Sequence, residues 1–153
     1  MQINLTQKER LLLEDQKSHE ETCIEKYSNY ANQAKDIQLK QICKNNEQIE
    51  RSHLDTINQL LSGTVPQINQ QQNQNTAQVS NSTQSAAGNF SDKEICSDLL
   101  MTEKYVSGAY DTAIFEFKDT EVRDVLNHIQ KEEQKHGEAI FKYMDSKGMY
   151  NIQ

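Results

Sequence analysis

The stretch that decides the fold is Leu99–Met144, LLMTEKYVSGAYDTAIFEFKDTEVRDVLNHIQKEEQKHGEAIFKYM. It contains a glutamate, a tyrosine one heptad later and then a Glu-x-x-His motif: Glu103, Tyr110, Glu133 and His136. The same residue types occur 83 positions earlier, at Glu20, Tyr27, Glu50 and His53. The chain therefore contains two copies of one helical hairpin, and each copy supplies one glutamate and one Glu-x-x-His motif.

Apolar residues recur at steps of three and four along both copies, which is the spacing of a helix with one buried face. Capping boxes at Thr6–Glu9 and Ser91–Glu94 predict the starts of the first and third helices. The second and fourth helices are expected to begin after an aspartate and end at a glycine: Asp36 and Gly63, Asp119 and Gly148. No segment has the pattern of a strand. The fold class is therefore predicted to be all-α, an antiparallel four-helix bundle.

At 153 residues the chain fits a single domain, 1–153. Its expected parts are hairpin one (6–63), an Asn/Gln/Ser-rich crossover (64–90) and hairpin two (91–148). The crossover has few groups worth burying, and it would let the chain return along the bundle, so that both hairpins place their ligands at one level. An alternative interpretation is that the Asn/Gln tract drives self-association.

The composition argues against several classes of partner. A net charge of −7 provides no basic face for nucleic acid. No apolar run approaches the roughly 20 residues that span a bilayer, so no membrane partner is expected. The N-terminus has no secretion-signal pattern, which favours cytoplasmic synthesis without a signal peptide. Three cysteines without a C-x-x-C motif argue against a disulfide framework or a zinc ribbon.

Four glutamates lie on the inward apolar faces, where ionised carboxylates would repel one another and lose hydration. Two divalent cations would balance their four charges, and two imidazoles would add nitrogen ligands. Mixed oxygen and nitrogen ligation suits iron or manganese rather than structural zinc. We therefore expect two Fe or Mn ions, bound by Glu20, Glu50, His53, Glu103, Glu133 and His136. The alternative is a metal-free bundle with acidic edges.

Other residues near these motifs have less specific expectations. Tyr27 and Tyr110 are expected either to hydrogen-bond a ligand carboxylate of the opposite hairpin or to be ordinary core tyrosines. Glu132 is expected to point off the apolar face into solvent, and His128 to lie at the surface or its boundary. Gly108, in the middle of the third helix, is expected to allow close approach of a neighbouring helix.

The repeated Glu plus Glu-x-x-His arrangement, separated by a long crossover, resembles the ferritin-like superfamily, rubrerythrin and bacterioferritin included. That resemblance implies a ferritin-like bundle and assigns the metal-ligand role to the six residues named above. It does not imply a route for electrons. Rubrerythrins usually append an iron module with paired C-x-x-C motifs, which this sequence lacks, so a peroxidase of that type would need an outside reductant.

The C-terminal half resembles the spore coat protein F family more closely. The shared features are Leu99-Leu100, Lys104 with a tyrosine after it, Glu121-Val122-Arg123 and Lys147-Gly148-Met149-Tyr150. Met149 stands where that family usually has an aromatic residue. The resemblance implies a ferritin-like bundle from a spore former, a location in the spore coat, and either other coat proteins or further copies of the chain as partners.

Two functions of different classes follow from these patterns. The first is a ferritin-like protein of the coat F type with a dinuclear Fe or Mn centre, active on peroxide or oxygen or in oxidising ferrous iron. The second is a structural coat or assembly protein without catalytic activity. Whether the protein is an enzyme stays open on the sequence. Metal content would separate the two functions.

Overall fold

The computed structural model describes residues 1–68 and 90–152 and confirms the predicted all-α class. Its helices are α1 (Gln7–Gln33), α2 (Ile37–Leu61), α3 (Asp92–Glu116) and α4 (Thr120–Ser146). Within the described ranges there is no strand, and an isolated β-bridge joins Gln2 to Thr64. Most of the predicted crossover, residues 69–89, lies outside the described residues.

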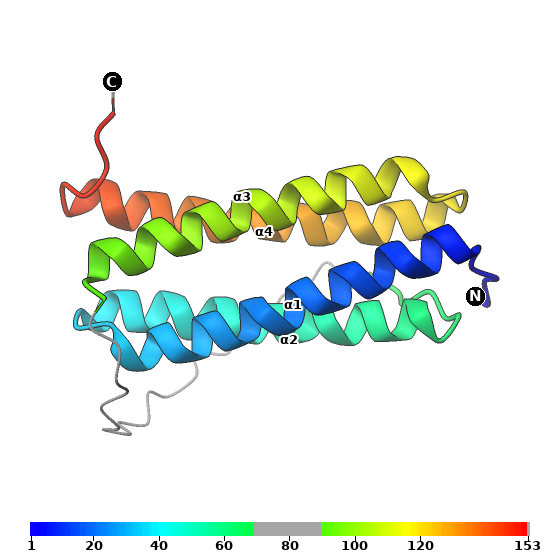
Figure 1. Cartoon of the computed structure of the whole chain (residues 1–153), viewed down its shortest axis with the longest axis horizontal. Coiled ribbons are helices and arrows are strands. Elements are labelled where there is room, and N and C mark those ends of the chain that lie inside the picture. Colours follow the sequence, from blue (N-terminus) through cyan, green and yellow to red (C-terminus); the bar gives the residue numbers. More distant parts are fainter. Residues whose placement is uncertain (69–89, 153) are drawn as a thin grey trace.

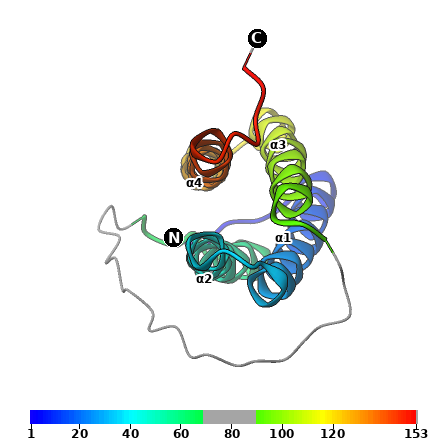
Figure 2. The ribbon, with the colours of Figure 1, turned by 90° about the vertical axis from the view of Figure 1, so that its left-hand side faces the viewer.

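The helices form two antiparallel hairpins that stack on each other (Figure 1, Figure 2). α1 packs along α2 and α3 along α4, while contacts of α1 with α3 and of α2 with α4 join the hairpins. α2 finishes at the end of the bundle opposite to the one at which α3 begins (Figure 1). All four neighbouring pairs are therefore antiparallel, and the middles of the two hairpins lie at the same level.

The predicted helix starts are confirmed, because each has the side chain that satisfies its free backbone amides. Thr6 and Ser91 each complete a capping box at the start of α1 and α3. Asp36 and Asp119 accept hydrogen bonds from amides in the first turns of α2 and α4. These local interactions stop each helix from extending into the preceding turn and so keep the hairpins in register.

Two apolar clusters fill the core, one toward each end of the bundle. The first includes Leu13, Leu60, Phe117 and Leu126, and the second includes Ala34, Leu39, Ile95 and Met144. Along α2, α3 and α4, the predicted ligand positions fall between residues of the two clusters. The predicted ligands thus form a polar layer in the middle of the bundle, and one apolar cluster lies on each side of it.

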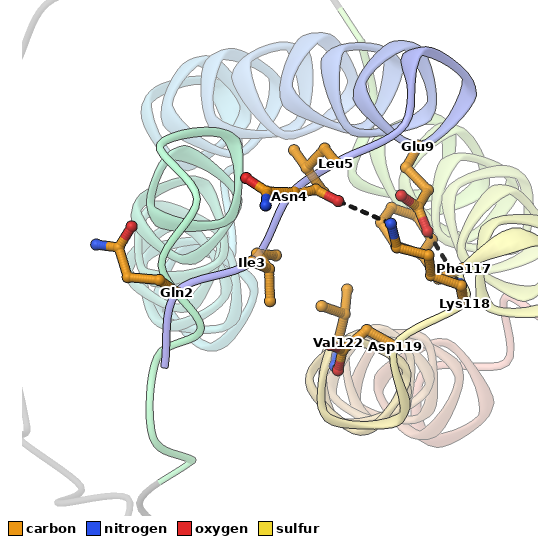
Figure 3. A pocket seen from close by; sticks show the side chains of 9 residues that line it. All are labelled: Gln2, Ile3, Asn4, Leu5, Glu9, Phe117, Lys118, Asp119 and Val122. Atoms are coloured by element: carbon orange, nitrogen blue, oxygen red, sulfur yellow. Dashed lines mark hydrogen bonds between the residues drawn. The ribbon is translucent and has the colours of Figure 1, made fainter.

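Each hairpin also caps the turn of the other with a carboxylate from its first helical turn. Glu9 Oε1 accepts a hydrogen bond from the Lys118 amide in the α3–α4 turn (2.9 Å). At the position 83 residues later, Asp92 Oδ1 accepts from the Lys35 amide in the α1–α2 turn (2.9 Å). Figure 3 shows the first contact beside a pocket of about 250 Å³, where Lys118 Nζ also donates to the Asn4 carbonyl (2.9 Å). The duplication thus extends to the interactions that join the hairpins.

The interpretation of Gly108 as a close-packing position is wrong. A Cβ atom built on Gly108 meets no atom of the described residues within 4 Å, so this face of α3 is open. Glycine inside a helix costs about 1 kcal/mol relative to alanine, because it loses more backbone freedom on folding. Here that cost has no packing benefit to offset it.

Gly108→Ala is therefore expected to raise the free energy of unfolding by about 0.5–1 kcal/mol, measured by urea denaturation. The matched control is Gly148→Ala, since Gly148 has φ +67° and a side chain there is strained. The control should be destabilised. A neutral or destabilising Gly108→Ala would mean that an unidentified contact uses this face.

Candidate metal centre

The structure brings the six predicted ligand side chains together in the polar layer. Each helix contributes at the same level: α1 through Glu20, α3 through Glu103, and α2 and α4 through one Glu-x-x-His motif each. None of the six residues is more than 3% exposed. Residues related by the 83-residue repeat lie toward opposite ends of the bundle, as Leu13 and Cys96 do, and share a level only near the middle of their helices. The ligands converge because both copies carry them at mid-helix.

The six residues form two overlapping groups of four, within which the candidate ligand atoms all lie within 4.8 Å of one another. The groups are Glu20, Glu50, His53 and Glu133, and Glu50, Glu103, Glu133 and His136. Glu50 and Glu133 belong to both groups, whereas Glu20 and Glu103 belong to one each. The arrangement thus has two shared and two unshared carboxylates.

Glu50 and Glu133 each lie between the two imidazoles. Glu50 Oε2 is 3.1 Å from His53 Nδ1, and its other oxygen, Oε1, is 3.2 Å from His136 Nδ1. Glu133 places Oε1 3.1 Å from His53 Nδ1 and Oε2 3.6 Å from His136 Nδ1. Each shared carboxylate therefore presents one oxygen to each histidine.

Several carboxylate oxygens in this layer lack a hydrogen-bond partner among the described residues. They are Glu20 Oε2, Glu103 Oε2 and Glu133 Oε2, and each is fully buried. A buried oxygen that could carry charge and has no donor is costly, whereas a bound cation would satisfy it. The donor set and these unpaired oxygens fit a pair of divalent ions.

The two buried tyrosines link the hairpins through the unshared carboxylates. The Tyr27 hydroxyl in α1 donates to Glu103 Oε1 in α3, and the Tyr110 hydroxyl in α3 donates to Glu20 Oε1 in α1 (2.5 Å). Each tyrosine thus holds one oxygen of the opposite hairpin's glutamate, and the other oxygen is buried without a hydrogen-bond partner among the described residues. Asn46 donates in turn to the Tyr27 hydroxyl (3.3 Å).

Comparison with protein families gives a match for the second hairpin. Residues 91–153 match the Coat F domain. The match contains Glu103, Glu133 and His136, while their counterparts in α1 and α2 lie outside it. No curated protein and no solved structure gives a significant match to the chain. None of the helices described combines the length and the apolar composition needed to cross a membrane.

Within the Coat F match, Glu132 is a site residue that the sequence prediction placed wrongly in solvent. It is 5% exposed, and its Oε2 lies 2.6 Å from Nε2 of His53. Its Oε1 lies 3.2 Å from Nε2 of the half-exposed His128. The sequence did indicate that Glu132 is buried. It follows Ile129 by three residues and precedes His136 by four, which puts all three on one helical face.

Burial and hydrogen bonding divide the four carboxyl groups into two kinds. Burial raises the pKa of Glu20, and it raises the pKa of Glu103 to about 7. Burial acts the same way on Glu50 and Glu133, but their neighbours outweigh it. His136 and His53 lower the pKa of Glu50 to about 2, and Glu103 and both histidines lower the pKa of Glu133. Without metal and near pH 6, the unshared pair is therefore protonated and the shared pair ionised.

Both histidines are held in the charged form when no metal is present. Burial opposes the charge, but hydrogen bonds with surrounding carboxylates, including Glu132 for His53 and Glu103 for His136, raise both pKa values well above the usual range. Two imidazolium groups then face two carboxylates, so the metal-free layer is close to neutral. Four carboxylates with two divalent ions and neutral imidazoles give the same net charge.

Tyr110→Phe is expected to lower the free energy of unfolding of the metal-free protein by about 1–3 kcal/mol, since Glu20 Oε1 would lose its buried donor. Urea denaturation in the presence of a chelator measures this. Tyr105→Phe is the matched control, because Tyr105 also lies on α3 but is 67% exposed. Equal stability of the two variants would contradict the role given to the Tyr110 hydroxyl.

Proposed function

We propose that this protein is a ferritin-like protein of the spore coat whose bundle core binds two Fe or Mn ions. The observation that carries the proposal is the pair of buried four-residue groups sharing Glu50 and Glu133. The Coat F match supports the spore coat as its location and other coat proteins, or further copies of the chain, as its partners. When bound, such ions would supply redox chemistry with peroxide or oxygen, or oxidation of ferrous iron.

The residues have distinct parts in this proposal. Glu50 and Glu133 would bridge the two ions, while Glu20 with His53 and Glu103 with His136 would complete one position each. Tyr27 and Tyr110 would orient the unshared carboxylates through their hydroxyls. The apolar clusters above and below the layer exclude bulk water, which strengthens every electrostatic interaction within it.

A second function, structural support within the coat without catalysis, is favoured by a specific observation. Each histidine already contacts at least two carboxylates, and each buried tyrosine hydroxyl donates to one. The polar layer is thus largely paired through its own residues, and such a network could fix the packing of the four helices without an ion.

Metal analysis of protein purified without a chelator tests the proposal. The expected content is about two Fe or Mn ions per chain, the stoichiometry of dinuclear carboxylate bundles. Glu50→Ala and Glu133→Ala should each lose both ions, since each removes a ligand common to both positions. Glu138→Ala is the matched control on α4, because Glu138 is exposed and pairs with Lys142. If the wild-type protein is fully folded and takes up neither metal, the metal proposal fails and the structural function is the one supported.

A further inference from the structure

The two histidines differ in what their outer nitrogens contact. His53 Nε2 lies 2.6 Å from the Glu132 carboxylate. His136 Nε2 is equally buried, but it has no hydrogen-bond partner among the residues that the structure describes. The Nδ1 atoms of both rings face the shared carboxylates, so Nε2 is the atom that a supporting residue would hold.

The difference originates in the sequence duplication. Glu132 directly precedes the ligand Glu133, and the residue at the same position of the first hairpin is Ile49, directly before Glu50. An isoleucine side chain has no acceptor for an imidazole N–H. The six proposed ligands are therefore repeated in both hairpins, whereas the acceptor behind the histidine is present once.

A carboxylate that accepts the outer N–H of a metal-binding histidine keeps the lone pair of the other nitrogen directed at the ion. It also makes that nitrogen a better donor, and removing such a partner typically costs 10–100-fold in metal affinity. His136 would bind an ion with its outer N–H buried and without an acceptor, which is an additional cost.

We infer that the two metal positions are unequal, and that the ion held by Glu20 and His53 binds first and at least about tenfold more tightly than the ion held by Glu103 and His136. This inference rests on the proposed dinuclear centre and adds Glu132 to it as a positioning residue. A further difference between the two sides, Asn46, contacts a ligand through Tyr27, so its effect on affinity is smaller.

Among the described residues, the His53 side of the centre also borders a pocket. A pocket of about 200 Å³ between α2 and α4 is lined in part by His53, His128 and Glu132. Glu132 therefore stands between the surface and the His53 side of the centre, where its negative charge would attract an incoming cation. This pocket and the stronger ligand set thus lie on the same side of the centre.

The test is a titration of metal-free protein with Mn²⁺ under anaerobic conditions, followed by calorimetry and electron paramagnetic resonance. Wild-type protein should bind Mn²⁺ in two steps whose Kd values differ by at least about tenfold, with the six-line signal of an isolated ion after one equivalent. Glu132→Ile gives α4 the residue that α2 has at this position. It should weaken the first step about 10–100-fold and leave the second unchanged.

Two further variants separate positioning from folding. Glu132→Gln keeps an oxygen acceptor and should retain most of the tight step. Ile49→Glu supplies the missing acceptor in the first hairpin and should tighten only the second step, provided that circular dichroism shows intact helices. If this variant does not fold, Glu132→Ile and Glu132→Gln still decide the matter.

The outcomes distinguish the inferred inequality of the two positions from the proposed dinuclear centre on which it rests. Two equal steps in the wild type, or equal weakening of both steps by Glu132→Ile, would overturn the inequality and leave the dinuclear centre standing. Failure of the wild type to bind Mn²⁺ and Fe²⁺ would overturn the proposed centre, and the inequality with it.

Discussion

The thermal unfolding midpoint of the metal-free protein should fall as the pH rises from about 5.5 to 8. Burial raises the folded-state pKa of Glu20, and that of Glu103 to about 7, so the folded protein keeps two protons that the unfolded chain releases above about 4.5. Stability therefore decreases as pH rises between these values. Over the roughly 1.5 units from pH 5.5 to its pKa of about 7, Glu103 alone contributes a loss of roughly 2 kcal/mol, at about 1.4 kcal/mol per unit.

The histidines act in the same direction over a higher range. Their folded-state pKa values are raised above the usual 6.5, so their stabilising contribution is complete below that pH and is lost as pH rises toward the raised values. Glu50 and Glu133 have lowered pKa values, and their contribution is lost only in acid, as pH falls below about 4.5. Metal-free protein should thus be most stable near about pH 4.5–5.

Bound metal should reverse this trend. Protons compete with cations for the same oxygens and nitrogens, so metal affinity, and with it the stabilisation by binding, increases with pH. The gap between midpoints with Mn²⁺ and with a chelator should widen from near zero at about pH 5 to several degrees or more at about pH 7.5. Differential scanning fluorimetry at a series of pH values measures both curves.

Glu133→Ala is the control for this reversal, because it should show no difference between Mn²⁺ and chelator at any pH. Glu138→Ala should behave like the wild type, since its side chain lies in solvent. Identical pH profiles of the wild type with and without metal would contradict the prediction and count against the dinuclear centre.

The second large effect is proton release on metal binding. At pH 6 the metal-free centre holds protons on both imidazoles and on Glu20 and Glu103. Two divalent ions need all six ligands in their unprotonated forms, so about four protons should leave as two ions bind. Calorimetric titrations in buffers with different ionisation enthalpies measure this number.

The pH dependence of that release provides an internal control. Because the Glu103 pKa is about 7, this carboxyl is largely ionised at pH 8, and the number should fall by about one between pH 6 and pH 8. A value near zero at pH 6 would mean that the imidazoles are neutral and the carboxylates ionised before metal arrives, and the charge distribution described for the metal-free layer would be wrong.

Helices and their ends could be predicted from sequence because local interactions determine them. A capping side chain such as Thr6 or Asp119 bonds amides within its own first turn, and the spacing of apolar residues determines which face of each helix is buried. The repeat added long-range information, since two antiparallel copies of one hairpin bring equivalent residues to one level when these lie near the middle of their helices. That is why six side chains named from the sequence lie in one layer.

Predictions failed where the outcome depends on how neighbouring helices are rotated and tilted. Glu132 lies at the border of the α4 apolar face, and only the position of α2 brings His53 within 2.6 Å of it. Gly108 occupies an ordinary mid-helix position, and only the packed structure shows that no atom of the described residues lies within 4 Å of a Cβ built there. The bonds of Glu9 and Asp92 to the opposite turns likewise required the packed hairpins.

The amino-acid sequence by itself determined an all-α chain of two repeated hairpins, their caps and their inward-facing acidic and imidazole side chains, because each of these depends on residues a few positions apart or on the repeat. Only the tertiary structure decided that Glu50 and Glu133 lie between the two imidazoles, that Glu20 and Glu103 flank them, and that Glu132 supports His53 but nothing equivalent supports His136 among the described residues. The physical reason is that these distances depend on how four rigid helices pack, and the packing is set by the whole core together.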